Sequence, residues 1–496
     1  MWASLTLFAV NGCHADGVAS TVRDGSLGDA RQEIETLGED GPKSDFVDSL
    51  AEWRDQSTDE AQRDAGLEDV RRMDRVEVGM QTDASPMDGP DDRLDMHDIF
   101  RGDAGVFTMG AVRSISAKDD LTCVVPASGE VYCWGSSPTF FPGIPIEDQY
   151  RPRRMAGYRS VVSTGQTGSA VCAVDEVGAV WCSGGHVDDS FSLGLDAGIL
   201  VRIAGRRMDV QNAIRLAWQL SGSILLVVRT DGTLYARVHH PPIQSYNFSF
   251  PSPAIDVSAN ADSFCVVLRD GRVACKGSYI SDVMPWPFAE GPRIVEGLTN
   301  VASVAVGWGF YCALKRDGTV WCWGNNIYGQ TGTPPPMAER CYIYQYGSTT
   351  ITRVYSSCVR RPRQVEGLTD VVELSAGEFM VCARKRDGTV WCWGDNSGVD
   401  RGGFGGTIGD GLPATEVCRR EPWDPPSATP DDPPCRARPS RVVGLTGVTG
   451  ISLGGNDACA ALASGQIWCW GNNAIGLLGD GTNEYRPTPV PVLPPL

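Results

Sequence analysis

The fold is decided by the stretch Cys312-Ala-Leu-Lys-Arg-Asp-Gly-Thr-Val-Trp-Cys-Trp-Gly324, because near copies of it recur along the chain. Residues 316–318, Arg-Asp-Gly, fit a three-residue hairpin loop whose last position needs a positive φ, which glycine adopts readily. This loop places Cys312 opposite Cys322 at a non-hydrogen-bonded site, where Cα atoms approach to roughly 4.5 Å. A disulfide spans such a distance. The stretch therefore predicts a β-hairpin closed by a disulfide at its open end.

Six copies of this stretch carry two cysteines ten positions apart, with a glycine six positions after the first. The predicted pairs are Cys123–Cys133, Cys172–Cys182, Cys265–Cys275, Cys312–Cys322, Cys382–Cys392 and Cys459–Cys469. In a seventh copy, around Asp231-Gly232, the two cysteine positions hold Leu226 and Ala236. Both partners are lost together, as a bond within one hairpin predicts and a bond between different repeats does not.

The seven copies start 39 to 77 residues apart, which gives a unit of about 40–50 residues, the length of a four-stranded propeller blade. Side chains alternate along the hairpin, and both of its faces are apolar. One face carries Cys312, Leu314, Val320 and Cys322, and the other carries Ala313, Trp321 and Trp323. A strand that is buried on both sides suits a blade packed between two neighbouring blades.

Residues 317–326, Asp-Gly-Thr-Val-Trp-Cys-Trp-Gly-Asn-Asn, followed by the Gly-Gln-Thr-Gly of residues 329–332, resemble the repeat of the regulator-of-chromosome-condensation family. The resemblance covers about residues 106–496. It implies an all-β, seven-bladed β-propeller, a blade number that agrees with the seven copies. We further expect residues 486–492 to close the ring by completing the blade that begins near residues 106–116, since an open ring would leave unpaired edges.

Two insertions, at about 333–362 and 412–440, lengthen the last intervals, and each holds two further cysteines 17 positions apart. The matching spacing suggests the pairs Cys341–Cys358 and Cys418–Cys435, although a sequence alone does not fix connectivity. Eight bonds leave only Cys13 unpaired. Zinc sites use Cys and His at shorter spacings, and five His lie away from the Cys pairs, so we expect structural disulfides, no metal and no cofactor. Disulfides on this scale indicate an oxidising, extracytoplasmic setting.

The N-terminal part differs from the repeats in composition. Residues 1–13 resemble a bacterial lipoprotein signal that ends at Cys13, which would carry the lipid; an ordinary secretory signal with a chance cysteine is the alternative. Residues 14–105 hold 25 acidic and 10 basic residues and few aromatic ones, and this composition predicts a disordered acidic tether. The remaining chain is close to neutral, which argues against nucleic acid as a partner.

Candidate chemistry within the repeats is sparse. The Asp-Gly pairs are ordinary hairpin turns, and His239-His240 lacks an acidic or Cys partner nearby, so we expect neither to be a site. No phosphate-binding loop, nucleophile elbow or zinc-protease motif is present, and catalysis is more doubtful than binding.

The insertions are the better candidates, because a rigid scaffold presents binding groups on loops. They are rich in Tyr, Trp and Arg, the residues enriched in interface hot spots. The candidate binding residues are Tyr342, Tyr344, Tyr346, Tyr355, Arg360, Arg361 and Arg363 in the first insertion, and Arg419, Arg420 and Trp423 in the second. Because the insertions follow the same element in adjacent repeats, we expect them to emerge side by side; the alternative is that they only cover a rim.

The sequence thus favours a monomeric, lipid-anchored or secreted propeller at a bacterial outer membrane or cell surface. We expect it to bind an extracellular protein or glycan without catalysis, and to meet the membrane only through its lipid. The competing hypothesis is an enzyme that acts on extracellular polysaccharide through a pocket on the propeller face. The nuclear guanine-nucleotide-exchange role associated with the resembled family does not suit a secreted chain.

Overall fold

The computed structural model describes the repeat region with several gaps. The described residues are 108–118, 120–135, 149–166, 170–184, 206–219, 224–238, 244–260, 263–277, 291–334, 339–346, 351–397, 406–413, 416–418 and 434–495. All of them belong to one compact unit, Asp103–Leu496. The expectations for Cys13, the tether and His239-His240 concern residues outside this set and stay predictions. Within the described set, no helix is long and apolar enough to cross a membrane.

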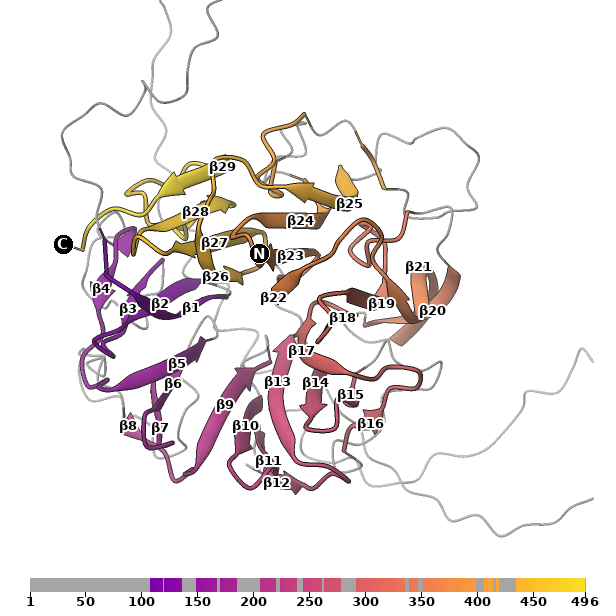
Figure 1. The fold of residues 1–496 in the computed structure, drawn as a ribbon, viewed down its shortest axis with the longest axis horizontal. Helices are drawn as coiled ribbons and strands as arrows, with labels where there is room; N and C mark the ends of the chain where they lie inside the picture. Colours follow the sequence, from indigo (N-terminus) through magenta and orange to yellow (C-terminus); the bar gives the residue numbers. More distant parts are fainter. Residues whose placement is uncertain are drawn as a thin grey trace, which may run out of the picture. The chain divides into compact units, whose positions relative to one another are not determined.

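Seven antiparallel sheets follow one another around a ring, and we number them as blades 1 to 7 in chain order (Figure 1). Blade 1 contains β1 (Val112–Lys118), β2 (Leu121–Pro126), β3 (Tyr132–Trp134) and β4 (Arg153–Arg154). Blade 2 contains β5 (Val161–Gln166), β6 (Ala170–Asp175), β7 (Val180–Gly184) and β8 (Arg206–Arg207). Blade 3 contains β9 (Ala213–Trp218), β10 (Ile224–Arg229), β11 (Leu234–Val238) and β12 (Gln244–Phe248). Blade 4 contains β13 (Ala254–Asn260), β14 (Ser263–Leu268), β15 (Val273–Lys276) and β16 (Arg293–Ile294).

Blade 5 departs from the four-stranded plan by one strand. It contains β17 (Val301–Val306), β18 (Phe310–Lys315), β19 (Val320–Asn325), β20 (Glu339–Tyr346) and β21 (Ile351–Gln364), in the sheet order β17-β18-β19-β21-β20. Blade 6 contains β22 (Val371–Ala376), β23 (Met380–Lys385), β24 (Val390–Asp395) and β25 (Cys435–Arg441). Blade 7 contains β26 (Val448–Leu453), β27 (Asp457–Leu462), β28 (Ile467–Gly471) and β29 (Arg486–Pro491). The seven-bladed all-β architecture expected from the sequence is therefore confirmed.

The repeated hairpin has the predicted register. Cys312 pairs with Cys322, and Gly318 adopts a φ of 81° in the turn. The carboxylate of Asp317 accepts hydrogen bonds from the backbone N–H of Thr319 at 3.0 Å and from its hydroxyl at 2.6 Å. These bonds lower the pKa of Asp317 and identify it as a turn residue.

All eight expected disulfides are present. In each of the six hairpin bonds the Cα atoms lie 4.1 Å apart, close to the separation expected at a non-hydrogen-bonded site. The two insertion bonds, Cys341–Cys358 and Cys418–Cys435, span 5.8 and 5.6 Å. In blade 3, Leu226 pairs with Ala236 in the same register, and both are fully buried.

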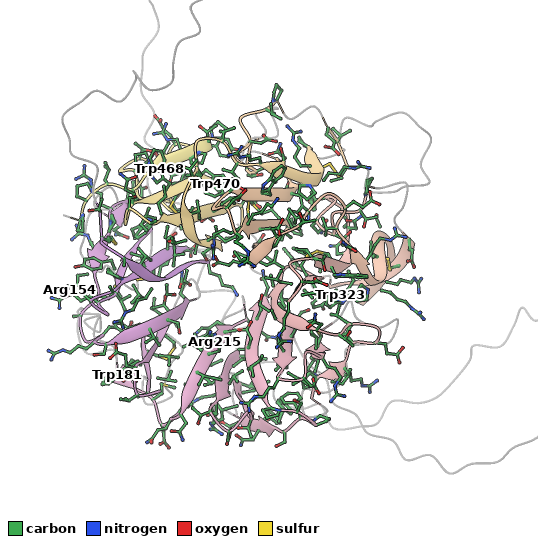
Figure 2. The ribbon with its side chains drawn as sticks, viewed as in Figure 1. Arg154, Trp181, Arg215, Trp323, Trp468 and Trp470 are labelled. Carbon is green, nitrogen blue, oxygen red and sulfur yellow. A yellow bond between two sulfur atoms is a disulfide. The ribbon has the colours of Figure 1, made fainter. Side chains whose placement is uncertain are left out.

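The hydrophobic core lies between the blades, in seven layers. Cys312 and Cys322 pack with Val371 and Val381 of the next blade, whereas Trp323 packs with Val301 and the residues of the preceding blade. Trp323 and Trp470, at equivalent positions in blades 5 and 7, are labelled in Figure 2. The two apolar faces predicted for the hairpin are thus both used, one toward each neighbour.

The first strand of each blade lines the centre of the ring, where hydrogen bonds join neighbouring blades. The backbone N–H of Val306 donates to Ser258 Oγ at 3.1 Å, and the N–H of Leu453 donates to Ser375 Oγ at 3.0 Å. Lys118 reaches across the centre from blade 1 and donates to the carbonyl oxygens of Trp218 and Ala259, at 2.7 and 2.8 Å. Polar contacts therefore hold the inner strands in a ring.

Ring closure differs from the expectation that the C-terminal strand would complete the first blade. β29 pairs with β28 of its own blade, and β1 pairs with β2, so the chain ends share no sheet. Instead, the N–H of Ala117 donates to Ser452 Oγ at 2.8 Å, and Trp134 packs against Leu478 and Val492. Each blade already satisfies its own strand pairing, so side-chain packing and inter-blade hydrogen bonds are enough to close the ring.

Candidate functional site

The first insertion forms a β-hairpin that extends blade 5 outward (Figure 1). β21 takes the place of the outer strand and pairs with β19, while β20 lies beyond it. The disulfide Cys341–Cys358 joins the two strands of the hairpin at its base. We call residues 339–364 the blade-5 hairpin. The β19–β21 pairing attaches the hairpin to the propeller, and the disulfide ties its two strands together.

The outer strand is irregular where the hairpin leaves the blade. Cys322 pairs with Arg363, but Gly324 pairs with Val359, so residues 360–362 form a bulge. Bulges of this kind redirect side chains away from the regular alternation of a strand. Arg360, Arg361 and Arg363 are all exposed, and Arg360 forms an ion pair with Glu339 at 3.4 Å. The bulge thus places a run of arginines on the outer surface.

A groove of about 730 Å³ lies beside this bulge, lined by Trp321, Glu339, Arg361, Arg363 and Glu366 among others. The Nζ atom of Lys315 lies 5.1 Å from the centre of the Trp321 ring, so the protein's own cation covers this indole. We call this cavity the blade-5 groove. An acidic or polar group is the ligand that its arginines suit best.

The charge of the blade-5 hairpin contrasts with that of the whole chain. Residues 339–364 contain five Arg and one Glu, a net charge of +4 in a chain of −18. Such a local excess attracts acidic surfaces and raises the association rate with them. Within the described residues, no group of three or more His, Cys, Asp or Glu side chains could hold a metal ion.

The candidate residues of the two insertions have different outcomes. In the first insertion, Tyr342, Tyr344, Tyr346 and Tyr355 lie on β20 and β21, with Tyr342 opposite Tyr355 in the register. Arg361 and Arg363 line the blade-5 groove, and Arg360 flanks them. In the second insertion, Arg419, Arg420 and Trp423 lie outside the described residues. Whether either set binds a partner stays a prediction.

The roots of the two insertions adjoin. A Cβ atom placed on Gly329 would lie 2.7 Å from the Cα of Ala437 and 3.2 Å from the Sγ of Cys418. Gly329 belongs to the loop that precedes the first insertion, and Cys418 and Ala437 lie at the base of the second. The two insertions therefore leave the same face of the propeller from neighbouring blades, and we call it the insertion face.

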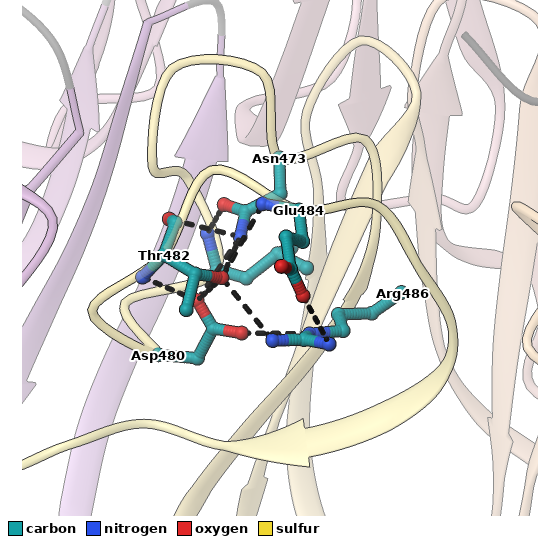
Figure 3. A network of polar contacts seen from close by, with 6 residues as sticks. Asn473, Asp480, Thr482, Glu484 and Arg486 are labelled. Carbon is teal, nitrogen blue, oxygen red and sulfur yellow. Dashed lines mark hydrogen bonds and ion pairs between the residues drawn. The ribbon is translucent and has the colours of Figure 1, made fainter. Parts of the chain in front are cut away.

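Buried polar networks fix the corresponding loops in blades 6 and 7. In blade 7, Asp480 accepts hydrogen bonds from Arg486 at 2.8 Å and from Asn473 at 3.0 Å, and the N–H of Thr482 donates to it at 3.0 Å (Figure 3). Burial raises the pKa of Asp480, but these hydrogen bonds outweigh it and leave the pKa below its usual value. The network has a structural role, because each of its groups is engaged by another.

Blade 6 repeats the ion pair between Asp480 and Arg486, and blade 5 lacks it. Asp410 pairs with Arg436 at 2.8 Å, and Arg436 occupies the same register position as Arg486. In blade 5 the two positions hold Thr333 and Val359, so both charges are replaced together. A carboxylate left alone in such a site would carry a large desolvation cost. The blade that lacks this Asp–Arg ion pair is thus the blade that carries the blade-5 hairpin.

Sequence reasoning missed an aromatic cluster on the insertion face. Trp308 and Phe379 lie in the loops that follow the inner strands of blades 5 and 6, and Tyr328 lies in the loop that precedes the blade-5 hairpin. Trp308 is 41% exposed. An alignment of the repeats could have found Trp308, because blades 6 and 7 have Glu378 and Gly455 at the same position and no aromatic residue.

The sequence and fold both have known relatives. Models of the "Regulator of chromosome condensation (RCC1) repeat" match residues 301–330 and 371–398, and residues 317–384. The chain is 28% identical over 232 residues to the mouse secretion-regulating guanine nucleotide exchange factor, a match that covers 45% of this chain and 43% of that protein. It is 28% identical over 236 residues to the human E3 ubiquitin-protein ligase HERC2, covering 46% of this chain and 4% of the ligase. The chain therefore spans less than half the length of these relatives.

Two solved structures share the fold at low sequence identity. Prp20p from Saccharomyces cerevisiae aligns with a TM-score of 0.53 and 16% identity, covering 78% of this chain and 87% of Prp20p. Human WBSCR16 aligns with a TM-score of 0.51 and 17% identity, covering 74% of this chain and 91% of WBSCR16. At such identities the likeness concerns the fold alone.

Proposed function

Because the chain belongs to the regulator of chromosome condensation repeat family, we propose that it is a non-catalytic scaffold that binds a protein partner through the blade-5 hairpin. The observation that carries the proposal is the run of exposed arginines on a disulfide-tied hairpin beside the blade-5 groove. A rigid element loses little conformational freedom on binding, so more of its contact energy appears as affinity.

The charge of the hairpin indicates the chemistry of the partner. An acidic protein surface complements its net charge of +4, and arginines flanked by tyrosines are typical of interface hot spots. The structure of Prp20p is described together with its binding to Gsp1p and histones, which shows that a protein of this fold can bind other proteins. Protein binding therefore has more support than catalysis.

The eight disulfides support an extracytoplasmic location as part of the proposal. The six hairpin bonds are buried in the layers between blades. Disulfides form and persist in oxidising compartments and are rare where thiols are kept reduced. Cys13, the one cysteine outside these bonds, is the proposed lipid attachment site. Palmitate labelling that is equal in wild type and Cys13→Ser would reject the anchor and leave the binding proposal intact.

The binding proposal is tested by reversing charge on the hairpin of the full chain. In Arg361→Glu/Arg363→Glu we expect at least a tenfold loss of affinity for the partner captured by wild type and then purified, because attractive contacts become repulsive. The matched control is Arg316→Glu/Arg386→Glu, which makes the same change of net charge at exposed hairpin turns. Calorimetry gives both affinities. If both variants lose the same affinity for the partner, the loss is explained by net charge alone, and the hairpin is rejected as the binding element.

A further inference from the structure

Trp308 presents one face of its indole ring to solvent on the insertion face. Its other face stacks on Phe379 of blade 6, with ring centroids 5.1 Å apart and an interplanar angle of 24°. Tyr328 packs against Phe379 in turn, at 4.8 Å and 48°. The stack on Phe379, which Tyr328 contacts in turn, orients the indole, although 41% of Trp308 is exposed.

Three other partly exposed rings among the described residues lie beside the protein's own cations. Lys315 Nζ lies 5.1 Å from the ring centre of Trp321, and Lys385 Nζ lies 5.9 Å from that of Trp391. The guanidinium of Arg229 lies 4.8 Å from the ring centre of Tyr235. In the part of the chain that the structure describes, Trp308 has no such cation, and its ring contact is with Phe379.

The blade-6 loop that supports Trp308 carries an acidic residue, Glu378. Its backbone N–H donates to the carbonyl oxygen of Glu378 at 2.9 Å, which brings the two loops together. The side chain of Glu378 extends toward Gly455, where an added Cβ would lie 3.7 Å from the carboxyl carbon. Glu378 thus puts an acidic residue in the blade-6 loop that supports the indole, and an indole face and a carboxylate both attract organic cations.

We propose that the exposed face of Trp308 receives a lysine or arginine side chain of a protein partner. The partner's cation would occupy the place that Lys315 and Lys385 occupy over Trp321 and Trp391. This site is separate from the blade-5 groove, whose arginines suit acidic groups, and it stands if the blade-5 hairpin proves inactive. It lies between blades 5 and 6, so a partner bound there would contact both.

The test uses a defined peptide and variants that leave the charge of the protein unchanged. The probe is a fluorescently labelled peptide with three repeats of Gly-Arg-Gly-Ser, and its counterpart carries citrulline, which is neutral, in place of arginine. Full-length wild type, Trp308→Leu and Trp391→Leu are titrated by fluorescence anisotropy. Trp391 is the matched control because Lys385 already covers it. General attraction of the cationic peptide to an acidic protein is the same in all three proteins.

We expect Trp308→Leu to bind the arginine peptide about three to ten times more weakly than wild type, with Trp391→Leu unchanged. Trp308→Phe should retain part of the affinity, because a phenyl ring still offers a π face. Unchanged binding by Trp308→Leu would overturn the proposal. So would a Trp308-dependent affinity for the citrulline peptide equal to that for arginine, since the ring would then recognise apolar surface and not charge.

Discussion

Blades 3 and 5 contain the same hairpin, but only blade 5 has the disulfide. Leu226 pairs with Ala236 in blade 3 as Cys312 pairs with Cys322 in blade 5. In both blades the pair is fully buried against the next blade. The register therefore does not depend on the covalent bond. The turn and the apolar faces set the geometry, and the disulfide stabilises a hairpin that is already specified.

At both of its borders, blade 3 lacks a serine hydrogen bond that joins several other pairs of blades. Ser258 stands opposite the first cysteine of blade 4, and its hydroxyl accepts a hydrogen bond from the inner strand of blade 5. The equivalent positions of blades 2 and 3 are Gly165 and Ala217, which have no hydroxyl. Both borders of blade 3 thus lack this serine hydrogen bond, and we expect blade 3 to open first under denaturing conditions.

The largest expected effect comes from removing the disulfide of blade 5. Cys312→Ala/Cys322→Ala should lower the free energy of unfolding by about 3 kcal/mol, from lost chain constraint and lost packing volume. Urea denaturation under non-reducing conditions measures it. Cys312→Leu/Cys322→Ala, which copies blade 3, should recover roughly 1 kcal/mol of this loss. If Cys312→Leu/Cys322→Ala is no more stable than the double-alanine variant, the Leu–Ala pair of blade 3 must be stabilised by contacts with its own neighbours that blade 5 does not offer.

The border between blades 3 and 4 should respond to pH. Burial raises the pKa of Asp256 on β13 to about 6, although Arg215 on β9 (Figure 2) lies 3.7 Å away and opposes the shift. The folded state then holds a proton that the unfolded state releases near pH 4, so this stability is lost as pH rises from about 4 to 6.

The variant Asp256→Asn removes this titration. Relative to it, wild type should lose roughly 2 kcal/mol of unfolding free energy between pH 4 and pH 7. Chemical denaturation of both proteins across that range measures the difference. A difference that does not change with pH would show that Arg215 keeps Asp256 ionised in the folded protein.

The smallest expected effect comes from adding the missing disulfide to blade 3. In Leu226→Cys/Ala236→Cys the bond should form, because the register matches that of the other hairpins. The constraint gained is offset by the lost burial of Leu226, so we expect stability to change by less than about 1 kcal/mol. Titration of free thiols before and after reduction detects the bond. Two persistent thiols would indicate that the backbones of blade 3 and its relatives differ.

Most of the fold could be predicted from the repeat, because each hairpin holds its own turn, register and pair of apolar faces. The paired change to Leu226 and Ala236 was enough to assign the six cross-strand bonds. Ring closure could not be predicted in the same way. The sequence around Arg486 resembles the segments that precede the first strand of a blade. That it pairs with β28, and not with the first blade, depends on which strand edge lies nearest to it in space.

The candidate site was predicted only in part. The arginines of the first insertion could be found by composition, but the bulge that exposes Arg360 and Arg361 beside Trp321 depends on how β21 joins β19. Trp308 was missed because a single tryptophan in a short loop looks like any other apolar residue. Its partner, Phe379, lies 71 positions away in the chain, and only the assembled ring brings their side chains together.

The sequence by itself determined the repeated unit: its hairpin turn, its disulfide register and the two apolar faces that require neighbours. These are local properties, set by φ preferences and by the alternation of side chains along a strand. The tertiary structure alone decided how the ring closes, where the blade-5 hairpin points, and how Trp308 stacks on Phe379 with part of its ring exposed. Those features depend on contacts between distant segments, for which the spacing of residues along the chain holds no signal.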